Sequence, residues 1–197
     1  MANRLVLASA SPARLRLLRA SGLEPDVVVS GVDESSLDGR SVPDVVLELA
    51  QRKAAAVARR ITGPALVIGC DSLLELDGVA LGKPSGPDEA RNRWKSMRGT
   101  EGCLLTGHCV IDTGRGEEVS EVAGTRVRFG HPTDAEIDAY VATGEPLEVA
   151  GAFTLDGYGA PFVDGVDGDP SNVIGLSLPV LRRLLLRLGI SLVDLWH

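Results

Sequence analysis

The chain has few of the residues that would cross-link it or anchor it in a membrane. Its 197 residues include three cysteines, none of which stands at the spacing of a zinc site, so we expect buried, reduced thiols. The apolar runs are shorter than the roughly 20 residues that span a membrane. The short N-terminal apolar run is followed by arginines, where a signal peptide would end. These absences predict a cytoplasmic protein without a membrane partner.

Positive charge and aromatic side chains are also scarce. Twenty Lys and Arg stand against 27 Asp and Glu, which gives a formal charge of -7, so the chain as a whole repels nucleic acid and anionic membranes. We expect neither of the two tryptophans to serve as a stacking platform for single-stranded nucleic acid. A phosphate ligand would therefore need locally placed cations, either basic side chains or a divalent metal ion.

The remaining composition is that of an ordinary globular chain. Hydrophobic residues make up 44% and charged residues 24%, and a chain of this size buries roughly 70% of its unfolded surface. The core therefore needs neither disulfides nor a structural metal. We find no internal repeat or low-complexity linker and expect a single domain over residues 1–197.

Strand-like and helix-like segments alternate through the first half of the chain. The expected strands cover residues 4–8, 26–30, 65–70, 103–112 and 119–129. The expected helices cover residues 12–20, 43–60, 87–97, 133–141 and 179–188. This order predicts an α/β fold with a mixed central sheet flanked by helices, and we expect two lobes around a cleft.

Lysine is rare enough for each one to be informative, with three lysines against 17 arginines. Lys53 falls on the apolar side of its helix. Lys83 follows the predicted turn Asp77–Gly78 and lies close in sequence to Asp71, which we place at the carboxyl end of a buried strand. Lys95 is typical of a surface. A snorkelling Lys53 and an exposed hairpin Lys83 are the structural alternative.

The segment GVALGKP at residues 78–84 superficially resembles a P-loop. It is one residue too short, and Pro84 stands where the magnesium-binding Ser or Thr belongs. It also follows a hairpin instead of opening a helix, so its amides would not point at a phosphate. We reject a P-loop.

Asp71 and Glu34 are the candidate ligands for a divalent cation, because Mg²⁺ and Mn²⁺ prefer carboxylate oxygens. Acidic loop residues are usually just solvated, and several others compete for the role: Asp33, Asp38, Asp77, Asp164, Asp167 and Asp169. The three histidines have no partner cluster that would suggest zinc or a catalytic triad, so we expect them to be structural.

Four segments, LASASPARLRLL, VLELAQRKA, GCDSLLELDGVALGKP and AGAFTLDGYGAPFVDGVDGDPSNVIGL, together resemble the Maf family of nucleoside triphosphate pyrophosphatases. The resemblance implies a fold similar to that of the inosine triphosphate pyrophosphatases and frequent homodimerisation. It also implies cleavage between the α and β phosphates, dependent on Mg²⁺, Mn²⁺ or Co²⁺, that yields a monophosphate and pyrophosphate. The implied role is removal of modified nucleotides. A nucleotide-sensing regulator of septum formation, acting through a protein partner, is the alternative.

The same resemblance assigns roles to particular residues. The phosphate-binding loop of the family falls on Ser9, Ser11 and Arg14. The family's metal-binding acid falls on Glu34 and its general base on Asp71. The family's helix lysine falls on Lys53 and its hairpin lysine on Lys83. Asp71 would orient or deprotonate the attacking water and share the metal with Glu34, while the basic side chains would neutralise charge on the phosphates.

Three positions implied to contact the base depart from the family pattern. Members that prefer dTTP and UTP have Arg, Thr and Gln where this chain has Ala13, Ser72 and Asp156, and members linked to 7-methyl-GTP have Trp, Gln and Glu. Asp156 is nearer to that Glu, and its carboxylate could accept a hydrogen bond from a base N–H. Ala13 leaves a space that Trp would fill. The sequence thus leaves the base preference open.

Overall fold

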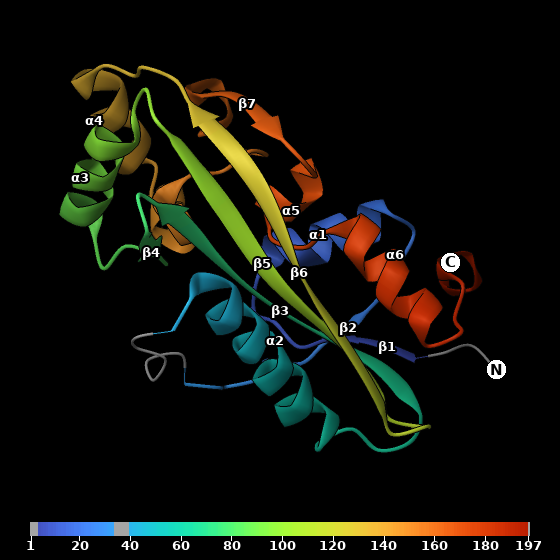
Figure 1. Cartoon of the computed structure of the whole chain (residues 1–197). Helices are drawn as coiled ribbons and strands as arrows, with labels where there is room; N and C mark the ends of the chain where they lie inside the picture. Colours follow the sequence, from blue (N-terminus) through green and yellow to red (C-terminus); the bar gives the residue numbers. More distant parts are fainter. Residues whose placement is uncertain (1–3, 34–39, 197) are drawn as a thin grey trace. The chain divides into compact units, whose positions relative to one another are not determined.

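The computed structural model describes residues 4–33 and 40–196, which divide into two compact units (Figure 1). The described residues of Met1–Asp71, Thr106–Ala123 and Gly175–His197 form unit 1, and Ser72–Leu105 with Gly124–Ile174 form unit 2. The strands that pass from one unit into the other are β3 (Ala65–Leu76), β5 (Glu101–Asp112) and β6 (Glu117–Phe129). The strand order is β2-β1-β3-β5-β6-β7, with β4 paired to β3. The predicted α/β fold with a mixed sheet is confirmed.

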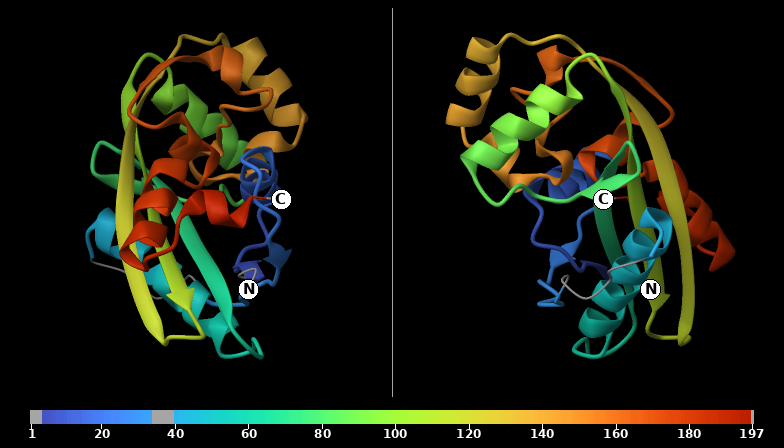
Figure 2. Two further views of the ribbon diagram at one scale, coloured as in Figure 1. Left: turned by 90° about the vertical axis from the view of Figure 1, so that its right-hand side faces the viewer. Right: turned by 60° about the vertical axis from the view of Figure 1, so that its left-hand side comes forward.

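In unit 1 the sheet separates two apolar clusters. Strand β1 (Arg4–Leu7) pairs in parallel with β2 (Asp26–Val27) and with β3. Alternate residues of a strand face opposite ways, and accordingly Leu7 belongs to a cluster with α1 (Pro12–Ala20) and α6 (Leu178–Arg187), whereas Val6 belongs to a cluster with α2 (Val42–Ala58). Figure 2 shows α2 and α6 on opposite sides of the strands.

Two glycines allow α2 to lie close against the strands. A Cβ at Gly69 of β3 would come within 2.3 Å of the carbonyl oxygen of Ala50, and a Cβ at Gly107 of β5 within 2.0 Å of the carbonyl oxygen of Val46. At both points the helix backbone packs directly on strand backbone. Side chains of α2 near these points, such as that of Lys53, are therefore buried against the sheet.

Strand β2 ends three residues before its predicted end at residue 30, at Val27. The next carbonyls are bonded by a side chain instead of a neighbouring strand: Nη2 of Arg60 donates to the carbonyl oxygens of Val29 at 2.6 Å and Ser30 at 3.4 Å. Backbone carbonyls need a partner but not a particular one. The arginine that binds these two carbonyls comes from another part of the chain.

Strand β3, in contrast, continues past its predicted end at residue 70. It runs to Leu76, so Asp71 lies within the strand and not at its carboxyl end. The residues after Asp71 keep the alternation of a strand and pair antiparallel with β4 (Val79–Leu81). The predicted turn Asp77–Gly78 connects the two strands, and both residues have the positive φ that such a turn requires, 49° and 78°.

Unit 2 is built around Trp94, a fully buried residue of α3 (Pro87–Met97). Its ring meets those of Phe129, Tyr140 and Phe162 edge to face, with centroids 5.9, 5.6 and 5.8 Å away. The indole Nε1 donates to the carbonyl oxygen of Ala152 at 2.7 Å, which satisfies its single polar group. Five of the seven aromatic residues of the chain lie in or against this core.

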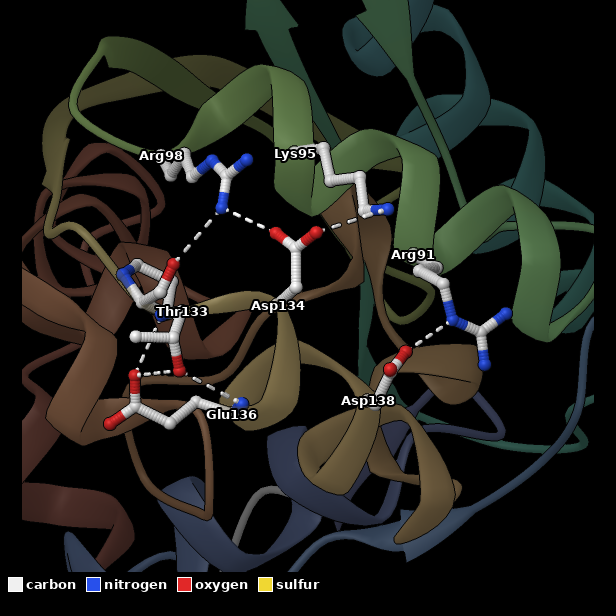
Figure 3. Close-up of polar contacts among 8 residues, drawn as sticks. Arg91, Lys95, Arg98, Thr133, Asp134, Glu136 and Asp138 are labelled. Carbon is white, nitrogen blue, oxygen red and sulfur yellow. Dashed lines mark hydrogen bonds and ion pairs between the residues drawn. The ribbon is translucent and has the colours of Figure 1, made fainter.

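Ion pairs join the exposed faces of α3 and α4 (Asp134–Ala142), as Figure 3 shows. Asp134 lies 2.6 Å from Arg98 and 3.5 Å from Lys95, and Arg91 lies 2.5 Å from Asp138. Exposed pairs of this kind contribute little singly. Thr133 and Glu136 form a capping box at the start of α4. Lys95 is a surface residue, as predicted, and takes part in this network.

The segment from residue 145 to residue 174 consists of short elements: η1 (Glu145–Glu148), η2 (Ala150–Ala152), η3 (Ala160–Phe162), β7 (Val163–Asp167) and α5 (Pro170–Ile174). Strand β7 pairs antiparallel with β6. After α6, the short helix η4 (Leu192–Leu195) follows. None of the helices in residues 4–33 and 40–196 is both long enough and apolar enough to span a membrane.

All three cysteines carry free thiols, as predicted. Cys70 and Cys109 are buried, and burial raises the pKa of the Cys70 thiol to about 11. Cys103 is only half-buried, which corrects the expectation for that residue. Its Sγ lies beside Gly124, which has no side chain to cover it.

Replacing Gly69 by alanine should lower the free energy of unfolding by about 2 kcal/mol, because the added methyl group must displace the Ala50 carbonyl in a packed interface. Chemical denaturation measures the change. Gly86→Ala is the matched control, since Gly86 has an extended φ of 175° and no atom lies within 4 Å of the point where its methyl group would be added. Equal losses of unfolding free energy in the two variants would contradict the importance of the close approach of α2 to β3.

Candidate active site

A buried ion pair lies where α2 crosses β3. Nζ of Lys53 is 2.6 Å from Oδ1 of Asp71, and each side chain is 9% exposed. Asp71 is two residues after Gly69 on β3 and so shares the face that α2 covers. Burying one of these charges without the other would be strongly unfavourable. Lys53 thus does not snorkel to solvent, and the sequence prediction of a lysine near the apolar face is confirmed.

The loop between β1 and α1 contains two of the predicted phosphate-binding residues, Ser9 and Ser11. Ser11 caps α1, because its Oγ accepts the backbone N–H of Arg14 at 3.4 Å. Oγ of Ser9 accepts the backbone N–H of Ser11 at 3.1 Å. The amino end of a helix carries partial positive charge and attracts anions. The serines thus shape a loop that leads into a helix start of the kind that binds phosphate.

Arg14 points into unit 1 and is 9% exposed. Its Nε donates to the carbonyl oxygen of Gly175 at 2.7 Å, and its Nη1 donates to the carbonyl oxygen of Cys70 at 3.0 Å and to Oγ of Ser9 at 3.2 Å. Since Cys70 precedes Asp71, Arg14 joins the loop to the strand at the carboxylate. The guanidinium therefore organises the loop, and its contact with a phosphate stays a prediction.

Gly175 is suited to this contact for two reasons. Its φ is 118°, a conformation that side chains rarely allow, and a Cβ there would come within 3.2 Å of Nε of Arg14. The sequence showed a glycine-rich segment here but gave no sign of the partner, which lies 161 residues away.

Lys83, in unit 2, lies on the exposed loop after β4. Its Nζ is 3.7 Å from Glu148, and the two side chains are 64% and 81% exposed. The backbone of the loop is held more firmly, because the carbonyl oxygen of Gly82 accepts from Nη1 of Arg93 at 2.5 Å and from the N–H of Gly151 at 3.1 Å. The backbone is fixed while the ammonium group stays in solvent. This arrangement suits both the catalytic role and the structural alternative.

The remaining predicted residues are distributed over both units. Ser72 follows Asp71 on β3 and is half-buried, Ala13 is half-buried on α1, and Asp156 is exposed in unit 2. Glu34 lies outside the described residues. Among residues 4–33 and 40–196, no group of three or more His, Cys, Asp or Glu side chains could hold a metal ion.

His108, expected to be structural, connects β5 to the segment that holds Arg14. Its Nε2 accepts the backbone N–H of Ser177, the N-cap residue of α6, at 2.7 Å. Burial and, second, the nearby charge of Arg14 lower the pKa of His108 to about 4. The ring is therefore neutral near pH 7 and can accept this hydrogen bond. In the sequence His108 is one of several polar residues of a largely apolar strand, which gives no sign of this contact.

Together these features define an α/β protein whose first unit holds a serine-capped helix start and a buried lysine–carboxylate pair. The comparison with known families specifies the class further. Residues 4–188 match the family described as Maf-like protein. The chain belongs to the Maf family.

Several curated relatives share most of their length with this chain. A protein of Streptomyces coelicolor named nucleoside triphosphate pyrophosphatase is 63% identical over 98% of this chain and 95% of its own length. Proteins of the same name from Streptomyces avermitilis and Salinispora tropica are 60% and 54% identical over 98% of this chain, and over 95% and 87% of their own lengths.

A crystal structure of a nucleoside-triphosphatase, dITP/XTP pyrophosphatase, from Mycobacterium abscessus aligns with 64% of this chain and 72% of its own. The sequence identity is 16% and the TM-score is 0.39. A similarity of this size does not establish a shared fold.

Acidification should destabilise the protein through His108. The pKa of this ring is about 4 in the folded protein against 6.5 ordinarily, so the unfolded chain takes up its proton first. The stabilisation is complete above pH 6.5 and is lost as the pH falls through 4, by roughly 3 kcal/mol. Unfolding free energies measured between pH 7 and pH 4 report the loss.

His108→Gln keeps an acceptor for the N–H of Ser177 but does not titrate, so its stability should depend less on pH by this amount. His131→Gln, at an exposed histidine, is the control and should keep the wild-type dependence. The role assigned to His108 is wrong if the wild-type and His108→Gln profiles run parallel.

Proposed function

We propose that the protein hydrolyses nucleoside triphosphates between the α and β phosphates, releasing a nucleoside monophosphate and pyrophosphate. The buried Lys53–Asp71 pair next to the loop that Arg14 organises is the observation that carries the proposal. A nucleotide sensor needs cations for the phosphates but no carboxylate to act on water, so the pair favours turnover over the sensing alternative. The shared name of relatives at 54% to 63% identity supports the same choice.

In this reaction a water oxygen attacks one of the two phosphorus atoms joined by the α–β bridging oxygen. The bond from that phosphorus to the bridging oxygen then breaks. Asp71 orients the water or takes its proton. Lys53, 2.6 Å away, fixes the orientation of that carboxylate and contributes positive charge. Ser9, Ser11 and the amides at the start of α1 bind phosphate oxygens, and Lys83 with Arg14 offsets the charge that grows on them.

A divalent cation, Mg²⁺, Mn²⁺ or Co²⁺, is part of the proposal. Such cations often bind one or two protein carboxylates and take their other ligands from substrate phosphates and water. Asp71 is a suitable hard ligand, and Glu34 is the second residue that the family resemblance implies. When bound, the cation supplies Lewis-acid polarisation of the phosphate oxygens.

The wider setting follows from the family resemblance and the composition. We propose a cytoplasmic homodimer that clears modified nucleotides and binds neither nucleic acid nor membranes. The formal charge of -7 supports the last point. Sedimentation of the purified protein would give its oligomeric state directly.

Asp71→Asn should lower kcat by at least about 100-fold while nucleotide binding is largely retained, because the amide cannot take a proton from water. Release of pyrophosphate and monophosphate is measured with a panel of natural, methylated and deaminated nucleoside triphosphates, with each of the three cations. Lys83→Ala should weaken both binding and turnover.

Asp138→Asn is the matched control, because it removes one exposed carboxylate from α4 and should leave the rate unchanged. Thermal unfolding of each variant distinguishes loss of the general base from loss of folding. This control is needed because Asp71→Asn leaves the charged Lys53 buried opposite a neutral side chain, which can destabilise the protein. A folded Asp71→Asn variant that keeps a near-normal rate would contradict the proposed role of Asp71.

The preference for one base over another should change when two of the implied base-contacting residues are replaced by those of the members that prefer dTTP and UTP. The double substitution Ser72→Thr with Asp156→Gln should move the ranking of kcat/KM toward these two nucleotides, since an amide can both donate to and accept from the base. The measurement is kcat/KM over the same panel. An unchanged ranking would remove Ser72 and Asp156 from base selection.

A further inference from the structure

Three consecutive residues that precede α6 are held from two directions. We call residues 175–177, with the sequence GLS, the 175–177 segment. All three residues are buried. The carbonyl oxygen of Gly175 accepts from Nε of Arg14, at 2.7 Å. The N–H of Ser177 donates to Nε2 of His108, also at 2.7 Å. Both hydrogen bonds are buried and join parts of unit 1.

His108 is a fixed point for this segment. The ring is 1% exposed, and its Nε2 accepts a hydrogen bond only while the proton of the neutral ring is on Nδ1. Burial lowers the pKa of the ring to about 4, so the neutral form persists near pH 7. The partner residue is held on its other side as well, because Oγ of Ser177 accepts the N–H of Val180 at 3.2 Å and caps α6. Ser177 is therefore bonded to a strand and to a helix.

Gly175 depends on such an anchor, because a glycine does little to fix its own carbonyl group. Its φ is 118°, and a residue without a side chain passes easily to other backbone conformations. Leu176, which follows, is fully buried in the apolar cluster of α1 and α6, and Ser177 is bonded to His108. The direction of the Gly175 carbonyl therefore depends on the residues that follow it.

Arg14 transmits this direction to the loop before α1. The guanidinium is planar and rigid, so its nitrogens do not move independently. While Nε donates to Gly175, Nη1 donates to the carbonyl oxygen of Cys70 at 3.0 Å and to Oγ of Ser9 at 3.2 Å. The same Oγ accepts the N–H of Ser11 at 3.1 Å. A shift of the Gly175 carbonyl would turn the guanidinium and disturb the loop on which both serines lie.

We propose that His108 is a positioning residue for phosphate binding and acts on the loop before α1 through the 175–177 segment and Arg14. The inference rests on the proposed function only in taking this loop as a phosphate-binding element. His108 itself touches no substrate, and no step of the reaction passes through its ring. Loss of its acceptor removes the bond that holds Ser177 to β5, so that the segment can shift.

The test separates weaker substrate binding from loss of folded protein. His108→Leu removes the acceptor and should raise KM for the best triphosphate substrate about tenfold, while kcat changes by less than about threefold. Contacts that form equally in the substrate complex and in the transition state affect KM and not kcat. Binding of inorganic tripolyphosphate with Mg²⁺, measured by titration calorimetry near neutral pH, should weaken by the same factor. Global destabilisation would instead lower the fraction of active enzyme, and with it kcat at constant KM.

Two matched variants isolate the cause. His108→Gln keeps an acceptor and should recover most of the lost affinity. Thr133→Ala removes the N-cap of α4, in unit 2, and so lowers stability without touching the 175–177 segment; it should leave KM unchanged. If His108→Leu fails to fold, His108→Met carries the test, because the flexible methionine side chain adapts to the space of the ring and its sulfur is only a weak acceptor.

The outcomes distinguish this role from the proposed function. Unchanged KM and unchanged tripolyphosphate affinity in the folded His108→Leu or His108→Met variant would overturn it, as would a fall in kcat at constant KM. Equal losses in His108→Gln and His108→Leu would also overturn it, because the acceptor would not be the cause. Tripolyphosphate affinities that change as expected, in a protein that releases no pyrophosphate from any triphosphate, would instead contradict the proposed function and leave the role of His108 standing.

Discussion

The ion pair of Lys53 and Asp71 depends on how closely α2 lies against β3. The two backbones meet at Gly69, where even a methyl group would come within 2.3 Å of a carbonyl oxygen. Because of this contact, a lysine that could have reached solvent is instead buried opposite a carboxylate on the same face of the strand. A larger separation would leave two buried charges without their partner, which proteins tolerate poorly. The candidate chemistry in unit 1 therefore rests on backbone packing.

Around this pair, polar groups of unit 1 are bonded to one another in a chain. Arg14 binds Gly175 and Cys70, and Ser177, two residues after Gly175, donates to His108. The arginine and the neutral histidine are compatible because burial keeps the histidine uncharged near pH 7. The loop before α1 is thus linked through Arg14 to β3 and to the segment at Gly175, and its serines are placed before any ligand binds. Such preorganisation is what electrostatic catalysis requires.

Unit 2 uses the same principle for side chains that stay exposed. Arg93 of α3 holds the carbonyl group next to Lys83, and Glu145 of η1 accepts the Thr154 hydroxyl before Asp156 and the backbone N–H of Tyr158 after it. In each case a side chain from a helical segment fixes the backbone, while the residue proposed to meet the nucleotide faces solvent. The entropy of ordering the loop is then largely lost on folding, and binding needs to immobilise only a side chain.

The sequence by itself determined the local features: the alternation that divides β1 between two clusters, the Asp77–Gly78 turn, the capping box of α4 and the apolar side of α2 on which Lys53 lies. These depend on the preferences of neighbouring residues and on a fixed period. Only the tertiary structure decided that Arg60 binds the carbonyl groups of Val29 and Ser30, and that Arg14 points inward to Gly175. It also decided that Glu145 accepts hydrogen bonds from Thr154, Tyr158 and Gly159. Such contacts form between residues far apart in the chain or across a tight turn. Any hydrogen-bonding side chain of suitable reach could satisfy the same backbone or side-chain group. No local sequence pattern therefore specifies which side chain forms the contact.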